Sequence, residues 1–297
     1  MNALHVCVIV PVFNAAPYLP EALASVMLQT YPNWSMIVLD DGSTDDSLEI
    51  ARRFAAVDAR ITVRHDSLNR GLVARLNQMV DLTDAPLIAR MDADDIMHPE
   101  RLARQVQAFE RHPALDVLGS SAYALDHASR PYGFKEAPVV PEASAGFLAG
   151  SPLIHPSVML RREWLAAHPY DPRYERAEDF ALWWTTHRTS RLANLPEALL
   201  FYRERGLPYR GKYRRTSQAK RRLMRQIGRQ PAWRRLTRRV IAATYLKDLI
   251  YDLAFWTKLE DRLIERRSRP LSAAQALDAH TALAAVHRQL DAVRNAP

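Results

Sequence analysis

Short apolar runs that alternate with amphipathic helical segments constrain the fold of this 297-residue chain most strongly. The apolar runs at residues 5–10, 35–39, 61–64 and 86–90 are typical of buried strands. Segments at residues 17–29, 71–80 and 99–111, and one around Ile50 and Phe54, place large apolar side chains on one helical face. Ser43 or Thr44 is expected to be the N-cap of the helix around Ile50 and Phe54. Strands alternating with helices of this length predict βαβ units and a doubly wound, mostly parallel α/β sheet.

The pattern is weaker after Leu115, where residues 117–125 and 157–160 favour strands and residues 178–187 favour a helix. The single cysteine, Cys7, lies in an apolar run, excludes a disulfide framework and indicates a reducing compartment. No signal peptide is evident, and no window reaches the roughly 18 apolar residues of a membrane span. We therefore expect a cytoplasmic protein.

Positive charge is concentrated between Arg203 and Arg239, where 15 Lys or Arg residues accompany one acid, Glu204. This segment carries a net charge of +14, whereas the whole chain carries +8, so the rest of the chain sums to 8 − 14 = −6. The change in composition, with Gly206 and Pro208 close by, predicts a catalytic domain at 1–205 and a basic helical region at 206–297. Two interpretations of the segment are open: a solvated helical face with intramolecular ion pairs, or peripheral binding to the anionic inner face of the plasma membrane. Nucleic acid is not expected as a partner, because the segment holds few aromatic residues and no binding motif.

Two apolar stripes with heptad spacing follow the basic segment. They comprise Leu246, Leu249, Leu253, Trp256 and Leu263, and then Ala279, Leu283, Val286, Leu290 and Val293. The stripes predict two helices that pack on each other or on the catalytic domain. A homodimer formed through these helices is the alternative.

Carboxylates cluster where two of the expected strands end. Asp40 and Asp41 follow one strand, and the run Asp92-Ala-Asp-Asp95 follows another. In an open α/β sheet, ligands bind outside the carboxyl ends of the strands. Carboxylates gathered there repel one another, so that a cation or shifted pKa values must offset the repulsion. The sequence therefore predicts a site for a metal ion and a phosphate.

The segment after the first strand argues against other nucleotide folds. Neither a Gly-x-Gly-x-x-Gly run after Val10 nor a Gly-x-x-x-x-Gly-Lys run is present, so that a dinucleotide fold and a P-loop have little support. The segment Pro11-Val-Phe-Asn14 instead offers an extended backbone and one amide, which suit a base or a ribose.

An ordered set of motifs resembles the family 2 glycosyltransferases of the GT-A fold. The motifs are Val8-Ile-Val-Pro-Val-Phe-Asn14, Val38-Leu-Asp-Asp-Gly-Ser-Thr-Asp45, Asn69-Arg-Gly71, Arg90-Met-Asp-Ala-Asp-Asp95, Ile154-His-Pro-Ser-Val158 and Ala177-Glu-Asp-Phe180. The resemblance covers residues 4–203. It implies a GT-A sheet and the transfer of a sugar, with inversion, from a nucleoside-diphosphate sugar to a hydroxyl of a glycan or lipid-linked acceptor. The resemblance favours a UDP-sugar as the donor and Mn²⁺ or Mg²⁺ as the cofactor. No Gln-x-x-Arg-Trp motif is present, so we expect the addition of a single sugar.

The resemblance also implies roles for individual residues. Asp94 is the expected metal ligand, and Asp92 is expected to contact the ribose or a metal-bound water. Asp41 is expected to accept the ring N–H of a uracil-type base. The other expected donor contacts are Pro11, Phe13, Asn14, Asn69, Gly71 and Arg75.

On the acceptor side, Asp179 is the expected general base, because transfer requires the acceptor hydroxyl to lose its proton. Glu178 is expected to hold acceptor hydroxyls or Arg176. His155 is expected to line the sugar or acceptor pocket, or else to be a loop histidine with its hydrogen bonds satisfied. Of Trp183 and Trp184, one is expected in the core and the other against a sugar, and Trp183 is our choice for the acceptor pocket.

Bland alternatives apply to several of the neighbouring residues. Asp95 is expected to be the N-cap of the helix that starts at Pro99. Arg90 is expected to pair with an adjacent acid. Asp40 either braces its loop or caps the following helix.

Two other functions fit less well. A sugar nucleotidyltransferase would need a glycine-rich, arginine-containing loop after the first strand, and Pro11 to Asn14 is not such a loop. A non-catalytic nucleotide-sugar-binding protein would not be expected to carry both Asp94 and Asp179.

Overall fold

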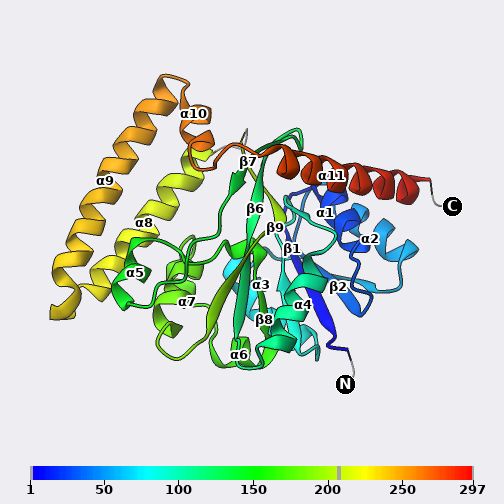
Figure 1. The fold of residues 1–297 in the computed structure, drawn as a ribbon, viewed down its shortest axis with the longest axis horizontal. Coiled ribbons are helices and arrows are strands. Elements are labelled where there is room, and N and C mark those ends of the chain that lie inside the picture. Colours follow the sequence, from blue (N-terminus) through cyan, green and yellow to red (C-terminus); the bar gives the residue numbers. More distant parts are fainter. Residues whose placement is uncertain (1–2, 206–208, 296–297) are drawn as a thin grey trace.

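The computed structural model describes residues 3–205 and 209–295. Its strands form one nine-stranded sheet in the order β3-β2-β1-β4-β8-β6-β9-β5, with β7 paired to β6 (Figure 1). The strands are β1 Val6–Val12, β2 Trp34–Asp41, β3 Ile61–Asp66, β4 Leu87–Arg90, β5 Ile96–Met97, β6 Val117–Asp126, β7 Pro131–Lys135, β8 Met159–Arg161 and β9 Leu192–Arg205.

Helices cover both faces of the sheet. The α-helices up to β9 are α1 Leu19–Met27, α2 Ser47–Val57, α3 Leu72–Gln78, α4 Arg101–Arg111, α5 Ser144–Ala149, α6 Arg162–Ala167 and α7 Glu178–Thr186. Alternate residues of β1 enter two different cores, as the two-residue period of a strand requires. Val6, Val8 and Val10 pack with α1, α2 and α4, whereas Cys7 and Ile9 pack with α3, α6 and α7.

The first half of the sheet is parallel, as predicted. Strand β1 pairs in parallel with β2 on one side and with β4 on the other, and β2 pairs in parallel with β3. The second half is mixed, because β8 lies between β4 and β6 and runs antiparallel to both. The strand order reverses between β1 and β4, and such a switch point opens a crevice beyond the carboxyl ends of the two strands.

The helix α2 starts later than predicted. Its N-cap is Asp46 rather than Ser43 or Thr44, and the carboxylate of Asp45 accepts the N–H of Ser47 at 3.0 Å. Ser43 and Thr44 instead bond to the loop after β1, so that their hydroxyl and amide groups are used between loops.

The long strand β9 was not predicted. Its pairing with β6 skips two residues, since Ser120 lies opposite Leu195 and Ser121 lies opposite Ala198. The skipped residues are Pro196 and Glu197. Proline cannot donate a hydrogen bond to a ladder, so that a register shift at this point lets the strand continue.

The described elements after β9 are helical: α8 Tyr209–Ile227, η4 Pro231–Trp233, α9 Arg234–Trp256, α10 Glu260–Glu265 and α11 Ala273–Arg294. The predicted boundary at Gly206 and Pro208 lies outside the described residues. The second apolar stripe packs as expected, because α11 buries Ala279, Leu283, Val286 and Leu290 in the core that contains α1. Figure 1 shows α11 lying along α1. None of the described helices is both long and apolar enough to cross a bilayer.

The prediction that the first stripe is a packing face is wrong. Helix α9 packs on α8 through another face, which buries Thr237, Thr244 and Tyr251. Leu246, Leu249 and Leu253 are exposed.

Candidate active site

A cleft of about 720 Å³ lies beyond the carboxyl ends of β1 and β4, at the switch point of the sheet. The end of β1 contributes Pro11, Phe13 and Asn14, and the end of β4 contributes Arg90, Asp92 and Asp94. The start of α7 adds Glu178 and Asp179, and η2 (His155–Ser157) adds His155. The cleft thus unites most residues that the motifs singled out.

Three neighbouring carboxylates, two of which line the cleft, form an acidic cluster. Each of Asp92, Asp94 and Asp95 offers an oxygen, and these oxygens all lie within 4.8 Å of one another. Arg90 was expected to pair with one of these acids, and its guanidinium lies 2.5 Å from Asp92 Oδ1. Oxygen ligands at this spacing suit a hard divalent cation such as Mn²⁺ or Mg²⁺.

Asp95 belongs to this cluster and does not cap a helix. Helix α4 begins at Arg101 with Glu100 as its N-cap, whereas Asp95 is buried and accepts the backbone N–H of Arg203 at 2.9 Å. Its Oδ2 is buried without a hydrogen-bond partner among the described residues. Burial, and then the charges of Asp94 and Asp92, raise the pKa of Asp95 well above its usual value. A bound cation would remove this electrostatic cost, so that the residues fit a metal ion.

The loops after β1 and β2 hold each other in place. Asn14, which adopts a φ of 51°, donates its N–H to Ser43 Oγ at 3.0 Å, and its Oδ1 accepts the N–H of Thr44 at 2.8 Å. Ala15 donates to Ser47 Oγ at 2.9 Å. These bonds hold Asn14 at the rim of the cleft and leave Phe13, which is 48% exposed, facing the space where a base could stack.

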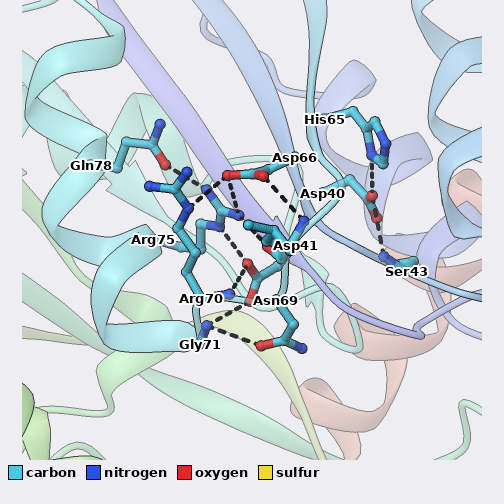
Figure 2. Close-up of polar contacts among 11 residues, drawn as sticks. Asp40, Asp41, Ser43, His65, Asp66, Asn69, Arg70, Gly71, Arg75 and Gln78 are labelled. Atoms are coloured by element: carbon cyan, nitrogen blue, oxygen red, sulfur yellow. Dashed lines mark hydrogen bonds and ion pairs between the residues drawn. The ribbon is translucent and has the colours of Figure 1, made fainter.

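Asp41 lies at the centre of a buried network (Figure 2). Its carboxylate accepts Arg75 Nε at 2.6 Å and the backbone N–H groups of Arg70 and Gly71 at 2.8 and 2.9 Å. Arg75 also donates to Gln78, to the carbonyl of Leu68 and to Asp66. The guanidinium of Arg75 thus holds Asp41 and its loop, while Asp41 Oδ2 retains a lone pair that could accept a further N–H.

Two glycines make this arrangement of loops feasible. Gly42 has a φ of +74°, and a Cβ at this position would lie 3.1 Å from the backbone nitrogen of Asn69. Gly71 has a φ of +82° in open space, where the backbone conformation alone favours glycine. Asn69 Oδ1 accepts the N–H of Gly71 at 3.0 Å. Asp40 braces its loop, because it accepts from Ser43 and bonds to His65 at 2.8 Å.

Replacing Arg75 with methionine is expected to lower the free energy of unfolding by about 3–5 kcal/mol, because the buried carboxylate of Asp41 loses its charged partner. The Arg75 and Asp41 side chains are 1% and 5% exposed. Arg53→Met is the matched control, since the Arg53–Glu49 pair is 72% and 63% exposed and should contribute less than about 1 kcal/mol. Urea unfolding measures both losses. Equal losses in the two variants would show that the Asp41 network does not stabilise the fold.

The acids at the start of α7 line the same cleft as Arg90, Asp92 and Asp94. Glu178 is 6% exposed, and burial together with the charge of Asp179 raises the pKa of Glu178 to about 7. Burial also raises the pKa of Asp179 above its ordinary value, and Ser151 Oγ lies 3.5 Å from its carboxylate. Arg90 is buried, and Nε and Nη1 have no hydrogen-bond partner among the described residues. Its charge attracts the acids on both sides.

The two expected acceptor residues have different surroundings. His155 lines the cleft and bonds to Tyr170 Oη at 2.9 Å; burial, and then the charge of Arg90, lower its pKa well below the usual value, which keeps it neutral. The expectation for Trp183 is wrong, because its side chain is 1% exposed and packs between Trp164 and His155 in the core. Trp183 does not line the cleft.

A second cavity of about 510 Å³ adjoins the cleft and shares His155, Arg176 and Asp179 with it. Its far wall comes from α8 and α9, which contribute Lys220 and Lys247. Lys135 of β7 also lines this cavity and pairs with Glu204 at 2.8 Å. Lys220 and Lys247 make no ion pair with a carboxylate of residues 3–205 or 209–295. Lys220 lies 4.7 Å from the ring of Phe180, and burial lowers its pKa.

Sequence reasoning missed the cleft residues that β9 and α8 supply. Tyr202 comes from β9, and Arg215 and Thr216 come from α8. Arg203 is buried beside the cleft, where its guanidinium donates to the carbonyls of Asp94 and Asp126. No local motif marks these residues, because their place depends on how distant elements pack.

Comparisons with known proteins show the family and the fold of this chain. The model of glycosyl transferase family 2 matches residues 7–164. EpsE of Bacillus subtilis (strain 168), itself a provisionally assigned glycosyltransferase, is 34% identical over 206 residues, which cover 67% of this chain and 73% of EpsE. Among solved structures, S. aureus TarS 1–349 in complex with UDP-GlcNAc has a TM-score of 0.61 at 19% identity, over 98% of this chain and 84% of that one. The mannosyltransferase PcManGT from Pyrobaculum calidifontis, in complex with GDP-Man and Mn²⁺, has a TM-score of 0.60 at 16% identity, over 93% and 86%.

The fold is that of the GT-A glycosyltransferases, as the resemblance predicted. The acidic cluster supports the use of a divalent metal in general. The chain belongs to glycosyl transferase family 2, and it is a glycosyl-transferring enzyme.

Proposed function

We propose that this protein transfers one sugar, with inversion, from a nucleoside-diphosphate sugar to an acceptor hydroxyl. The observation that supports the proposal is that one cleft is lined by two sets of acids, Asp92 and Asp94 after β4 and Asp179 at the start of α7. A leaving diphosphate needs a counter-charge, and an attacking hydroxyl needs a base. The cleft offers a group for each need.

On the donor side, Asp94, with Asp92 and Asp95 beside it, would hold the metal ion, which when bound neutralises charge on the leaving diphosphate. Phe13 can stack on a base beside Asp41, and Asp41 Oδ2 can accept the ring N–H of a uracil or a guanine; we take a uridine nucleotide as the first candidate. TarS was solved with UDP-GlcNAc, whereas PcManGT was solved with GDP-Man. Gly71 and Asn69 shape the loop that holds Asp41.

On the acceptor side, an Asp179 carboxylate oxygen takes the proton of the acceptor hydroxyl. The hydroxyl oxygen forms a bond to the anomeric carbon, and the bond from that carbon to the diphosphate breaks, with its electron pair leaving on the diphosphate. The backbone N–H groups at the start of α7 favour the carboxylate form of Asp179 and offset part of the rise in pKa that burial causes. Neutral His155 can offer a hydrogen bond to the acceptor. The acceptor would enter through the second cavity, whose lysines favour a glycan that carries phosphate or carboxylate.

A donor screen tests this function. Nucleoside-diphosphate sugars are offered with and without Mn²⁺ or Mg²⁺, and released nucleoside diphosphate is measured. We expect release only with the cation, and a product of inverted anomeric configuration by NMR. Release of pyrophosphate from a sugar phosphate and a nucleoside triphosphate would assign the protein to the nucleotidyltransferases instead.

The rate of transfer should fall as the pH falls through a pKa above the ordinary 3.8 of an aspartate, because the base must be deprotonated and burial raises the pKa of Asp179. Glu178→Gln removes a neighbouring negative charge, which favours the deprotonated form of Asp179. The acidic limb of the pH–rate profile should therefore move to lower pH in this variant. A limb that moves to higher pH, or does not move, would contradict the coupling of the two acids.

A further inference from the structure

The outward face of helix α9 carries a continuous row of exposed apolar side chains. Leu246, Leu249, Ile250, Leu253 and Trp256 are 46–82% exposed, with Trp256 the most exposed. Their spacing of three or four residues places them on one side of the helix. A large contiguous apolar surface of this kind marks a place where a partner or a membrane binds.

This row points away from the rest of the protein. The opposite side of α9 is buried through Thr237, Thr244 and Tyr251, and it packs on α8. In Figure 1, α9 lies at the left edge of the molecule, with α8 between it and the sheet. The row is therefore available to a partner outside the described chain.

The charges on α9 are sorted in the same way as its apolar residues. Its two acids, Asp248 and Asp252, pair with Arg221 and Arg214 of α8. The first turns of the outward face carry Arg235, Arg238 and Arg239, which are exposed and pair with no carboxylate of the described residues. The outward face is thus cationic at its start, apolar towards its end, and without acids.

We propose that the outward face of α9, from Arg235 to Trp256, docks on the surface of an anionic phospholipid bilayer. An amphipathic helix with cations and large apolar residues on its free face lies in the plane of such a surface. The row from Leu246 to Trp256 enters the boundary of headgroups and acyl chains, and the three arginines contact lipid phosphates. A second copy of this chain is a poorer occupant, because its face would bring three more arginines and no acid to pair with them.

Docking through α9 differs from the expectation that the basic segment Arg203–Arg239 binds an anionic membrane through its charge alone. Arg203, Arg205, Arg214 and Arg221 of the basic segment are ion-paired within the fold. Binding should therefore depend on the apolar row as well as on charge, and should weaken in salt without being lost.

The docking face lies on α9, which also contributes to the wall of the second cavity. Lys247 follows Leu246 directly and lines the second cavity beside Asp179. A glycan carried on a membrane lipid would reach the cavity from this side, a consequence that rests on the proposed function, whereas docking itself does not.

Flotation with vesicles tests the docking. We expect the full chain to float with phosphatidylglycerol vesicles at low salt, to bind phosphatidylcholine vesicles more weakly, and to remain partly bound at about 0.5 M salt. The variant L249E/L253E should lower the partition coefficient by a factor of about ten or more for each leucine, since each loses the gain of leaving water. Leu277→Glu on α11 is the matched control, because Leu277 is 71% exposed outside this face and its loss should leave binding unchanged. Vesicles should also shift the tryptophan emission to the blue in the wild type and less in Trp256→Phe.

The proposal would be overturned if the wild type did not bind phosphatidylglycerol vesicles at low salt, or if L249E/L253E and the wild type bound them equally. It would also be overturned if the wild type self-associated, L249E/L253E did not, and neither protein bound vesicles. The last result would assign the face to a second copy. Donor hydrolysis without vesicles should be the same in L249E/L253E and the wild type. Failure to dock would therefore leave the proposed transfer standing, and failure of the transfer would leave the docking result standing.

Discussion

Asp94→Asn is expected to lower the metal-dependent release of nucleoside diphosphate by a factor of about 10²–10³. The diphosphate would lose the counter-charge that a metal ion supplies, and such stabilisation is worth several kcal/mol of the barrier. Asparagine keeps the shape of the side chain and removes its charge, so that the fold should be preserved. Titration calorimetry with Mn²⁺ alone should show a loss of binding in this variant.

Asp84→Asn is the matched control for Asp94→Asn, because Asp84 is a fully exposed carboxylate that pairs only loosely with Arg162. It should keep both Mn²⁺ binding and turnover. Full activity of Asp94→Asn, or undiminished activity of the wild type in excess chelator, would remove the metal from the proposed mechanism.

Asp179→Asn is expected to lower turnover by a factor of about 10²–10⁴, the usual contribution of a general base. The affinity for the donor and for Mn²⁺ should change little, because the donor groups lie at the ends of β1 and β4. Single-turnover kinetics with a saturating donor measures the first effect, and donor titration measures the second. Glu175→Gln, at an exposed acid before α7, is the control and should behave as the wild type.

A loss of donor binding in Asp179→Asn would place this residue in the donor site instead. If the variant lost turnover because its free energy of unfolding had fallen, Asp179 would be a structural acid. The roles of Asp94 and Asp179 can thus be distinguished by what each variant loses, metal binding in Asp94→Asn and turnover alone in Asp179→Asn.

The N-terminal half of the fold could be predicted because its signals are local. The apolar run of β1, the acids after β2 and β4, and the periodic residues of α4 each lie within a few residues of one another. Their order along the chain then placed Asp41 and Asp94 at the same edge of the sheet. The residues around Asp94 could be found for the same reason.

The parts that the sequence did not predict depend on long-range packing. The strand β9 contains Pro196, which is unfavourable within a strand, and only its pairing with β6 shows how the register shift accommodates this residue. The role of Arg203, which contacts the loop of Asp94, requires the strand to be in place. Helical periodicity also could not distinguish the buried Trp183 from a residue in the cleft.

The apolar stripe of α9 shows a further limit. Leu246, Leu249 and Leu253 have the spacing of a buried helical face, and this spacing is the same whether a helix packs on protein or lies on lipid. Only the burial of Thr237, Thr244 and Tyr251, on the opposite side of α9, shows which side the fold covers.

The packing of α11 on α1 has a consequence for the synthesis of the protein. One of the first helices to leave the ribosome has a partner near the other end of the chain, and at ordinary rates of translation the two are made on the order of ten to fifty seconds apart. During this time Leu19 and Leu23 lack the cover of Leu283 and Val286, with which they share a core. The nascent enzyme therefore exposes an apolar surface until α11 emerges, and chaperones that bind such surfaces should associate with the chain up to that point.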